Sequence, residues 1–369
     1  MILLSLATFT SASVAQSSTP AATTAASSVV SYAYVGSTNA HITPFAVHAD
    51  GTATKLTVEN GPSGSVVVSS GFVWGADQTH ITTYTRNSNG TLSRTSTIDA
   101  TAHNDTPQGS GLGSLTLDKS GRTLYAGEID FQGADNNAYA AFSVGSTGKL
   151  GFVANSPINV DAGGPLTFSP ANHFAYTSGC FFLGFEIVGY ARAATNGALS
   201  SVATNASQPV ASDPNAFVCP VGQTVSARSV LALAYNDSIG TGTAANNKLA
   251  TYRIQQNGSL TLVNNSEKAT SFAAISDLRF DPTGQWLAVV GANGLQIFRL
   301  LNTGLLAAGP RVLTGTKLNH VQWDNKGHVV AMNGTSLFVY TFSNNTLKAA
   351  AGSPHALSSG GTLAVLPVQ

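Results

Sequence analysis

The chain has 369 residues, of which 43% are hydrophobic and only 9% are charged, whereas charged residues make up about 25% of a typical soluble domain. Lys plus Arg and Asp plus Glu number 17 each, without a basic run, which excludes the charge pattern of a nucleic-acid-binding protein and of a polybasic membrane-surface segment. Val, Leu, Ile and aromatic residues recur throughout, which excludes a disordered chain and favours many short strands joined by tight turns.

The N-terminal residues have the pattern of an export signal. A short apolar run lies within residues 1–10, and Ser13-Val14-Ala15 places small residues where signal peptidase cleaves, although no Lys or Arg precedes the run. The run is too short to span a bilayer. We therefore expect a signal peptide over residues 1–15, a Ser/Thr/Ala-rich linker over 16–28, and a secreted, periplasmic or extracellular protein without an integral membrane span.

A repeat runs through the rest of the chain. Each copy is an aromatic residue in an alternating strand, followed by a tight turn that carries Gly or Asn and then Leu. The copies start at Phe45, Tyr84, Phe142, Tyr190, Tyr252, Phe298 and Tyr340. The turn glycines lie on average about 51 residues apart, a period that is typical of propeller blades. Asn-Gly and Thr-Gly between alternating runs predict hairpins, because Gly and Asn accept a positive φ.

A second motif of strand, turn and strand precedes several copies. It spans 115–125, 278–287 and 321–330, with a less regular copy at 166–172. Each copy therefore predicts a four-stranded meander, here lettered a to d from the inside outwards. The first copy starts at residues 29–35 without a strand a, and residues 361–368 form a lone strand that supplies it. The sequence predicts one all-β domain over 29–369, a seven-bladed β-propeller closed by pairing of the C-terminal strand with the first blade.

The two cysteines, Cys180 and Cys219, admit two interpretations. In an oxidising compartment they form a disulfide, and otherwise they are two buried free thiols. Because the N-terminus indicates export, we favour the disulfide.

The predicted a–b and c–d turns are short, whereas the longer insertions fall in d–a and b–c loops. These insertions are Asp99–Gly111, Glu128–Asn137, Asn205–Ser226 and Asn236–Asn247. Both kinds of loop lie on one face of a propeller, and insertions on one face of a repeat protein mark its binding face. We therefore expect a small-molecule or protein partner on the face with the d–a and b–c loops. We also expect the protein to be a monomer.

Few polar residues on those loops are candidates for chemistry. The candidate catalytic residues are Glu128, Asp130, His103 and Asp237. A carboxylate pair with a histidine supports general acid–base catalysis, but the same residues also suit solvated loops that form Asx turns. Glu128, Asp130 and Asp135 match no EF-hand spacing, so we predict no metal and no cofactor.

Two further patterns have a structural and a functional interpretation. Trp74, Trp286 and Trp323 stand at strand positions and are interpreted as core residues. Asn89-Gly90-Thr91 and Asn257-Gly258-Ser259 match the N-glycosylation acceptor pattern, which matters only if the host glycosylates secreted proteins; otherwise they are turn residues.

The strand-turn-strand motifs at 117–125 and 280–287, with the Thr-Gly-x-Leu turns, resemble those of the lactonase-type propellers, a family that includes 6-phosphogluconolactonase and carboxymuconate-cyclising propellers. The resemblance covers 29–369 and implies a seven-bladed propeller in carbohydrate metabolism. It also implies polar residues around the channel mouth, often Asn or Arg at the end of strand b. The corresponding places here read Ala126-Gly127-Glu128, Ser178-Gly179-Cys180 and Gly291-Ala292-Asn293. The resemblance therefore implies the fold, with the catalytic positions degraded.

Two hypotheses follow for function. The first is a secreted binding or interaction propeller that lacks the family's catalysis. The second is a lactone hydrolase that acts on a sugar lactone or a related ester, although export argues against a phosphosugar substrate. The two differ at Glu128, whose loss is silent under the first hypothesis and damaging under the second.

Overall fold

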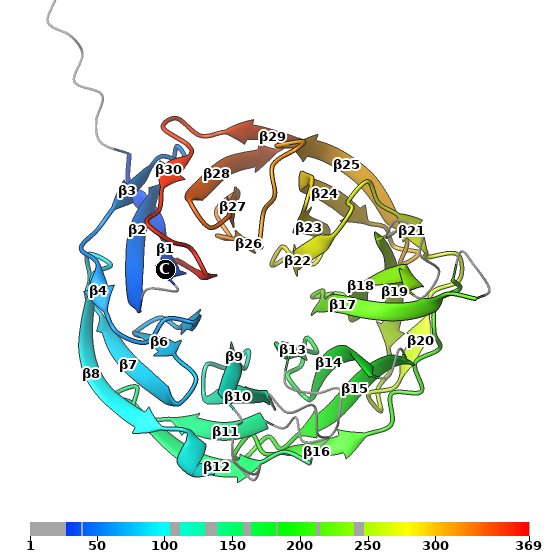
Figure 1. The fold of residues 1–369 in the computed structure, drawn as a ribbon, viewed down its shortest axis with the longest axis horizontal. Helices are drawn as coiled ribbons and strands as arrows, with labels where there is room; N and C mark the ends of the chain where they lie inside the picture. Colours follow the sequence, from blue (N-terminus) through cyan, green and yellow to red (C-terminus); the bar gives the residue numbers. More distant parts are fainter. Residues whose placement is uncertain are drawn as a thin grey trace, which may run out of the picture.

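The computed structural model describes residues 27–37, 40–103, 111–129, 139–157, 164–181, 184–211, 215–239 and 247–368. Within them the chain forms seven antiparallel sheets around a central axis, each a meander of four strands in the order a to d (Figure 1). The prediction of a seven-bladed β-propeller is confirmed.

From blade two to blade seven and then blade one, strand a is β5 (Ser65–Val68), β9 (Gly111–Leu117), β13 (Thr167–Phe168), β17 (Phe217–Val225), β22 (Ile275–Phe280), β26 (His320–Trp323) and β31 (Thr362–Pro367). Strand b is β6 (Phe72–Ala76), β10 (Thr123–Ile129), β14 (Phe174–Phe181), β18 (Val230–Ile239), β23 (Trp286–Gly291), β27 (His328–Met332) and β1 (Val29–Gly36).

Strand c is β7 (His80–Arg86), β11 (Tyr139–Val144), β15 (Gly184–Arg192), β19 (Asn247–Ile254), β24 (Gly294–Leu300), β28 (Ser336–Ser343) and β2 (His41–His48). Strand d is β8 (Leu92–Asp99), β12 (Leu150–Asn155), β16 (Leu199–Val202), β20 (Leu260–Leu262), β25 (Leu306–Val312), β29 (Thr346–Ala349) and β3 (Ala53–Lys55). Three short strands also pair with a strand c: β21 (Lys268–Ala269), β30 (His355–Ala356) and β4 (Glu59–Asn60). One 3-10 turn, η1 (Thr101–His103), follows β8.

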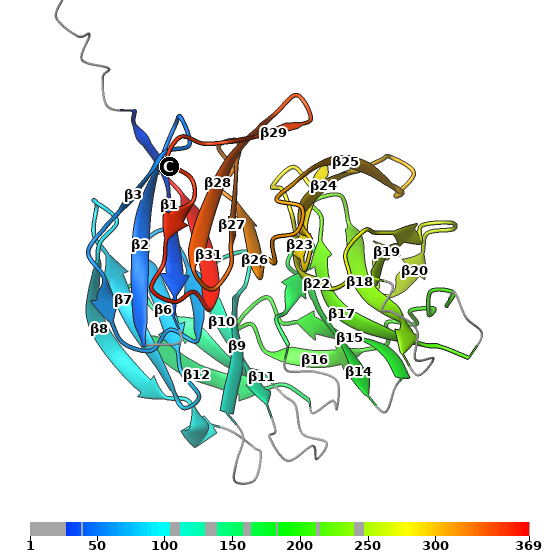
Figure 2. The same cartoon turned by 45° about the horizontal axis from the view of Figure 1, so that its top comes forward.

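The ring closes through the two ends of the domain. Strand β31 pairs with β1 in a register that runs from Ser31 opposite Pro367 to Gly36 opposite Thr362, and Figure 2 shows the two strands side by side. This pairing confirms the predicted closure. Strand β31 covers the edge of β1 that would otherwise be open.

A buried polar network also joins blade one to blade seven. The Ser31 hydroxyl donates to Asp324 Oδ2 over 3.1 Å, and His328 Nδ1 lies 2.6 Å from the same oxygen. Burial alone would raise the pKa of Asp324, but hydrogen bonds from the His328 side chain and from backbone amides outweigh it and hold the pKa below its usual range.

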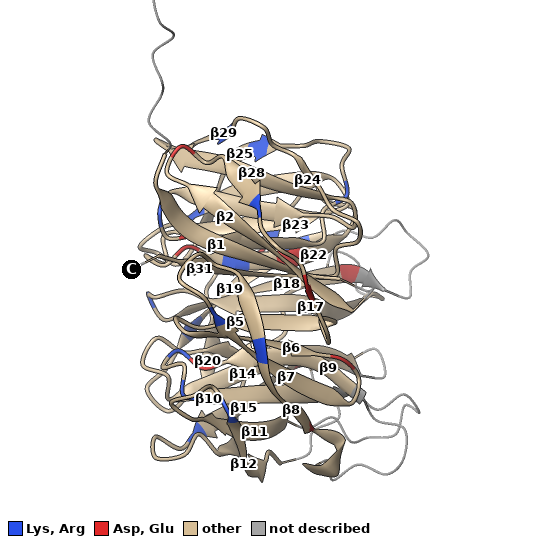
Figure 3. Cartoon of the chain, turned by 90° about the vertical axis from the view of Figure 1, so that its left-hand side faces the viewer, with Lys and Arg blue, Asp and Glu red and all other residues tan. Residues whose placement is uncertain are grey.

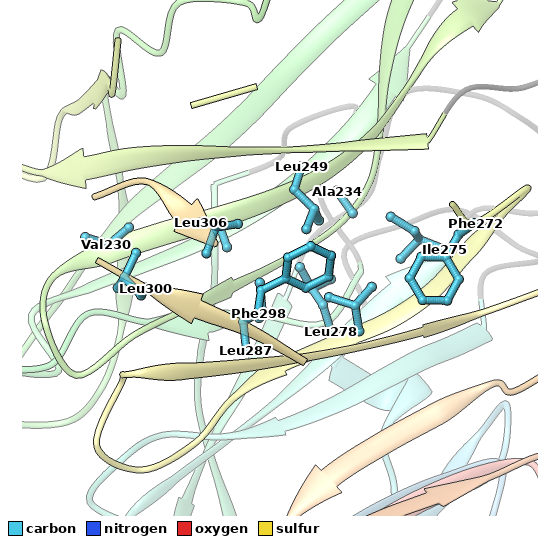
Figure 4. Packing of buried hydrophobic residues seen from close by; sticks show 12 residues of the cluster. Val230, Ala234, Leu249, Phe272, Ile275, Leu278, Leu287, Phe298, Leu300 and Leu306 are labelled. Atoms are coloured by element: carbon cyan, nitrogen blue, oxygen red, sulfur yellow. The ribbon is translucent and has the colours of Figure 1, made fainter. Parts of the chain in front are cut away.

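Apolar side chains fill the spaces between neighbouring blades. Along β23, Leu287 and Val289 pack towards blade five, whereas Ala288 and Val290 pack towards blade seven. This follows from the two-residue period of a strand, which sends successive side chains to opposite faces of the sheet. Figure 4 shows the cluster between blades five and six, in which Phe298 lies among aliphatic side chains of both blades.

In four blades, an aromatic side chain of strand b also links the blade to the next one. The side chain donates a hydrogen bond to the carbonyl oxygen of the glycine in the c–d turn of the next blade. The pairs are Tyr34 with Gly90 (3.2 Å), Trp74 with Gly148 (3.1 Å), Tyr125 with Gly197 (2.6 Å) and Tyr176 with Gly258 (2.9 Å). The repeated turn glycines of the sequence are therefore points of contact between blades.

The predicted insertions are shorter than expected where the structure describes them. The interpretation of Asn205–Ser226 as a loop is wrong over Phe217–Val225, which forms β17. Its pairing with β18 shifts register around Pro220 and Gly222, and these irregularities hide the alternating pattern in the sequence. Strands β10 and β18 likewise continue into the predicted insertions as far as Ile129 and Ile239.

Cys180 and Cys219 form a disulfide, as favoured from the sequence. Their Cα atoms lie 5.1 Å apart, and the bond ties β14 of blade four to β17 of blade five. It therefore fixes two neighbouring blades to each other.

Replacing both cysteines by serine is expected to lower the free energy of unfolding. The bond joins residues 39 positions apart, and a loop of this length gives about 4 kcal/mol in the chain-entropy model, which is an upper guide. Urea unfolding of the parent and the C180S/C219S variant, each with and without reductant, measures the effect. Reductant should affect the parent alone, and equal stabilities of parent and variant would contradict the expectation.

Charged residues are few and scattered in the side view of Figure 3. Within the part of the chain that the structure describes, no helix has the length and apolar character needed to cross a membrane.

Candidate binding site in the central channel

The seven inner strands surround a cavity of about 600 Å³ on the propeller axis. Residues from β5, β9, β13, β17, β22, β26 and β31, or directly beside them, line it. Every blade thus contributes to one central space, in the place where ring-shaped repeat folds form ligand sites.

Among the described strands, the inner edge of each strand a has no strand partner, so its backbone N–H groups need other acceptors. Side chains of the preceding blade supply several of them: Ser65 Oγ accepts from the Leu115 N–H over 2.9 Å, and Thr116 Oγ1 accepts from the Leu166 N–H over 3.1 Å. These bonds satisfy buried backbone donors and join neighbouring inner strands to one another.

The wall differs from side to side. On the side of blades one to three it carries half-buried apolar side chains, including Val67, Leu117 and Val365. On the side of blades six and seven it carries Arg279, His320 and Gln322. A ligand in the channel would therefore meet apolar groups on one side and hydrogen-bond donors on the other.

Asp277 organises the polar side of the wall. Its Oδ1 lies 3.3 Å from Arg279 Nη1, and its Oδ2 lies 3.8 Å from His320 Nδ1. The carboxylate also accepts the N–H of Leu278 (2.8 Å) and of Val321 (3.1 Å), so it joins blades six and seven as Ser65 joins blades two and three. The Arg279 and His320 side chains are each 32% exposed, against 9% for Asp277. Asp277 is thus a positioning group, and the two basic side chains are the ones that a ligand can reach.

Trp323 fixes the backbone beneath the arginine, because its indole Nε1 donates to the Arg279 carbonyl over 3.0 Å. The guanidinium itself donates to the Leu278 carbonyl over 3.2 Å. A guanidinium held on a rigid strand in this way can bind a carboxylate through its remaining N–H groups.

The candidate catalytic residues that the structure describes lie on different blades. His103, in η1, stacks on Phe152 with ring centroids 4.3 Å apart and meets the edge of Phe142 at 5.9 Å. These partners belong to the outer strands of blade three. Asp237 is buried in blade five, where its Oδ2 lies 2.6 Å from Lys248 Nζ.

The other two candidates are described only in part. The backbone of Glu128 pairs with Leu112 in β10, and Asp130 lies outside the described residues. A catalytic role for Glu128, Asp130, His103 and Asp237 therefore stays a prediction. Among the described residues, no group of three or more His, Cys, Asp or Glu side chains could hold a metal ion.

The sequence interpretation missed Asp277, Arg279 and His320. The signal that could have found them lies in the repeat itself. When the strand-turn-strand motifs are aligned, Arg279 stands where Thr116 and Thr167 stand in blades three and four. A charged residue at a position that is uncharged in other blades, on a strand next to the axis, indicates a function outside the shared fold.

The comparisons with known proteins support the fold. No protein-family model and no curated protein sequence matches the chain. Among solved structures, a hypothetical selenium-binding protein from Sulfolobus tokodaii has a TM-score of 0.59 at 9% identity, and the match covers 93% of this chain and 94% of that chain. Kuenenia stuttgartiensis hydrazine synthase has a TM-score of 0.54 at 12% identity, with 86% and 90% covered.

A third solved structure, a protein from Lactobacillus plantarum, has a TM-score of 0.51 at 17% identity, and the match covers 79% of this chain and 98% of that chain. At these identities the likeness is one of fold.

Proposed function

We propose that the protein is an exported binding propeller whose central channel takes up a small organic anion, without the catalysis of the lactonase-type family. The observation that supports it is the pair of partly exposed basic side chains, Arg279 and His320, on one side of a cavity of about 600 Å³. This volume lies within the range of about 300–1,000 Å³ that is common for small-molecule sites.

The charge of the lining favours an anion. Lys119 and Arg279 line the cavity together with His320, whereas Asp277 is covered and engaged by backbone amides. Valine and leucine side chains stand opposite Arg279 and His320, on the side of blades one to three, where Lys119 follows β9. The ligand that fits both sides is a carboxylate with an apolar or uncharged body.

Export is part of the same proposal, with a signal peptide over 1–15, a linker over 16–28 and the propeller over 29–369. The Cys180–Cys219 disulfide supports it, because such bonds persist in oxidising compartments. His320 is the first residue of β26, at the d–a end of the channel. We therefore place ligand uptake at the face of the d–a and b–c loops.

A lactone hydrolase is the second candidate function, and the spacing of Asp277 and His320 favours it. A histidine 3.8 Å from a carboxylate can act as a general base once a bound substrate closes the gap. In that case His320 would take a proton from the water that attacks the lactone carbonyl, and Arg279 would stabilise the oxyanion that forms there; the ring C–O bond then breaks, and the leaving alkoxide takes the proton back from His320.

Arg279→Gln is expected to weaken binding of the anion about ten-fold or more, because charge-assisted hydrogen bonds contribute about 1.5–3 kcal/mol. The measurement is titration calorimetry of the purified propeller with a panel of small aliphatic, aromatic and sugar carboxylates. Arg228→Gln is the matched control, since Arg228 is an exposed arginine in the a–b turn of blade five. Equal affinities of R279Q and R228Q would contradict the proposed site.

The parent protein and a His320→Gln variant separate the two functions in a weakly buffered pH-indicator assay with aldonolactones and aliphatic lactones. Turnover that disappears in His320→Gln would establish the hydrolase and place its base in the channel. Carboxylate binding without turnover would support the binding propeller. Neither binding nor turnover across both panels would contradict both functions.

A further inference from the structure

Eight Asn-x-Ser/Thr triplets occur in the sequence, and two of them occupy equivalent c–d turns. We propose that Asn89 and Asn257 are N-glycosylation sites of the exported protein, an inference that rests on the proposed export. Asn89 lies in the turn between β7 and β8, and Asn257 in the turn between β19 and β20; both are exposed. Acceptor asparagines of secreted proteins lie in surface turns of this kind.

The geometry of both turns fixes which amide atom faces solvent. The Thr91 N–H and hydroxyl donate to Asn89 Oδ1 over 3.1 and 2.7 Å, and Ser259 makes the same two bonds to Asn257 Oδ1 over 3.0 and 2.8 Å. A backbone N–H can only donate, so the atom that faces it must be the carbonyl oxygen. The amide nitrogen, which is the atom that carries the sugar, therefore points away from the turn.

Other asparagines show the opposite arrangement. Their Nδ2 atoms donate to oxygen atoms of the protein, and none of them heads an Asn-x-Ser/Thr triplet. These residues are Asn87, Asn155, Asn172, Asn247 and Asn293. In this set the engaged amides lack the acceptor pattern, whereas Asn89 and Asn257 combine the pattern with a turn that leaves Nδ2 outward.

The two turns are held firmly against the preceding blades. Gly90 (φ +86°) lies against the ring of Tyr32, and Gly258 (φ +85°) lies against the ring of Phe174. The attached glycans would project from the a–b and c–d face, opposite the face at which β26 begins with His320. Modification at these positions is therefore compatible with ligand uptake at the other face.

The chemistry leaves the turns intact. A lipid-linked oligosaccharide pyrophosphate is the donor: a bond forms between Asn Nδ2 and the anomeric carbon, the bond from that carbon to the pyrophosphate oxygen breaks, and a base takes the Nδ2 proton. The lipid pyrophosphate is the leaving group. Because Oδ1 remains a carbonyl oxygen, it keeps both hydrogen bonds of the turn.

The test uses the full chain, secreted from a eukaryotic host behind a signal peptide of known function. The protein is deglycosylated enzymatically in heavy-oxygen water, which converts each modified asparagine into labelled aspartate, and its peptides are analysed by mass spectrometry. We expect label at Asn89 and Asn257 in most molecules, lost at Asn89 in Thr91→Ala and at Asn257 in Ser259→Ala. Unlabelled Asn89 and Asn257 in the secreted protein would overturn the proposal.

Blade four provides a matched control. Asn196 Oδ1 accepts the Ala198 N–H over 3.0 Å in the equivalent c–d turn, where the hydroxyl is lacking. Ala198→Thr should therefore create label at Asn196, and failure to do so would overturn the role given to the turn. Asn236 heads a triplet inside β18, paired on both sides with Cys219 and Asn247, and is expected to stay unlabelled.

A second expression with the chain's own first residues as leader separates this proposal from the proposed export. If that chain stays inside the cell while the chain with the known signal peptide is secreted and labelled, then the export proposal fails and the acceptor sites stand. If both are secreted and neither is labelled, then the sites fail and export stands.

Discussion

Replacing Asp118 by alanine is expected to destabilise the propeller by about 3–5 kcal/mol, because it would leave a buried guanidinium without its counter-charge. Asp118 Oδ2 lies 2.6 Å from Arg192 Nη2, and the two side chains are 0% and 8% exposed. The pair joins the a–b turn of blade three to the end of β15 in blade four. The free energy of unfolding from urea titration measures the loss.

Asp118 also closes its own turn, and a control is needed for that part. Its Oδ1 accepts the N–H groups of Arg122 (2.9 Å) and Thr123 (3.1 Å). Asp281 makes the same turn bonds in blade six, to Gln285 (2.8 Å) and Trp286 (2.7 Å), without an ion pair among the described residues. Asp281→Ala should therefore cost less, and equal losses in the two variants would show that the ion pair contributes nothing.

Gly90→Ala is expected to lower the free energy of unfolding by about 2–5 kcal/mol, as the sum of a backbone cost of about 1–2 kcal/mol and an overpacking cost of about 1–3 kcal/mol. Gly90 has φ +86°, where a β-carbon is unfavourable, and that carbon would stand 2.1 Å from Tyr32 Cε1. The ring cannot move freely, because its hydroxyl donates to the Ser88 carbonyl over 3.1 Å.

Gly315→Ala separates the two costs. Gly315 has nearly the same φ, +85°, but a β-carbon there would meet nothing within 4 Å. It should therefore lose only the backbone part, about 1–2 kcal/mol. Thermal and urea unfolding of both variants provide the comparison, and a Gly90→Ala variant no less stable than Gly315→Ala would refute the tight contact with blade one.

Most of the fold could be predicted from the sequence, because each blade encodes its own hairpins locally. Gly258 and its equivalents stand at turns that only a few residue types can form, so the repeat is visible even where the strand residues differ. The prediction was wrong at β17, because Pro220 and Gly222 disrupt the alternation there. A strand held by its neighbours and a disulfide does not need a regular pattern of its own.

The candidate site could not be predicted in the same way. The polar groups of the channel come from separate blades, and Asp277 and Val321 meet across 44 positions of sequence. The sequence prediction placed the candidate residues on the loops, because charged residues are rare in this chain and several of them fall there. His103 shows the limit of that reasoning, since its ring stacks on an outer strand of blade three. Which side chains of an inner strand face the axis depends on how all the blades pack around it, and a single blade's sequence does not show this.

The pairing of β1 with β31 also has a consequence for the order in which the protein matures. Ser31 finds its partner Pro367 only when nearly the whole propeller has been synthesised. The inner edge of β1 therefore stays unpaired while the later blades are synthesised. Ring closure then joins β1 to β31, which are far apart in the sequence. Such long-range closure is slow compared with local hairpin formation. Until it occurs, the nascent propeller is an open arc whose exposed edge can pair with another chain, so ring closure by β31 removes an edge at which aggregation can begin.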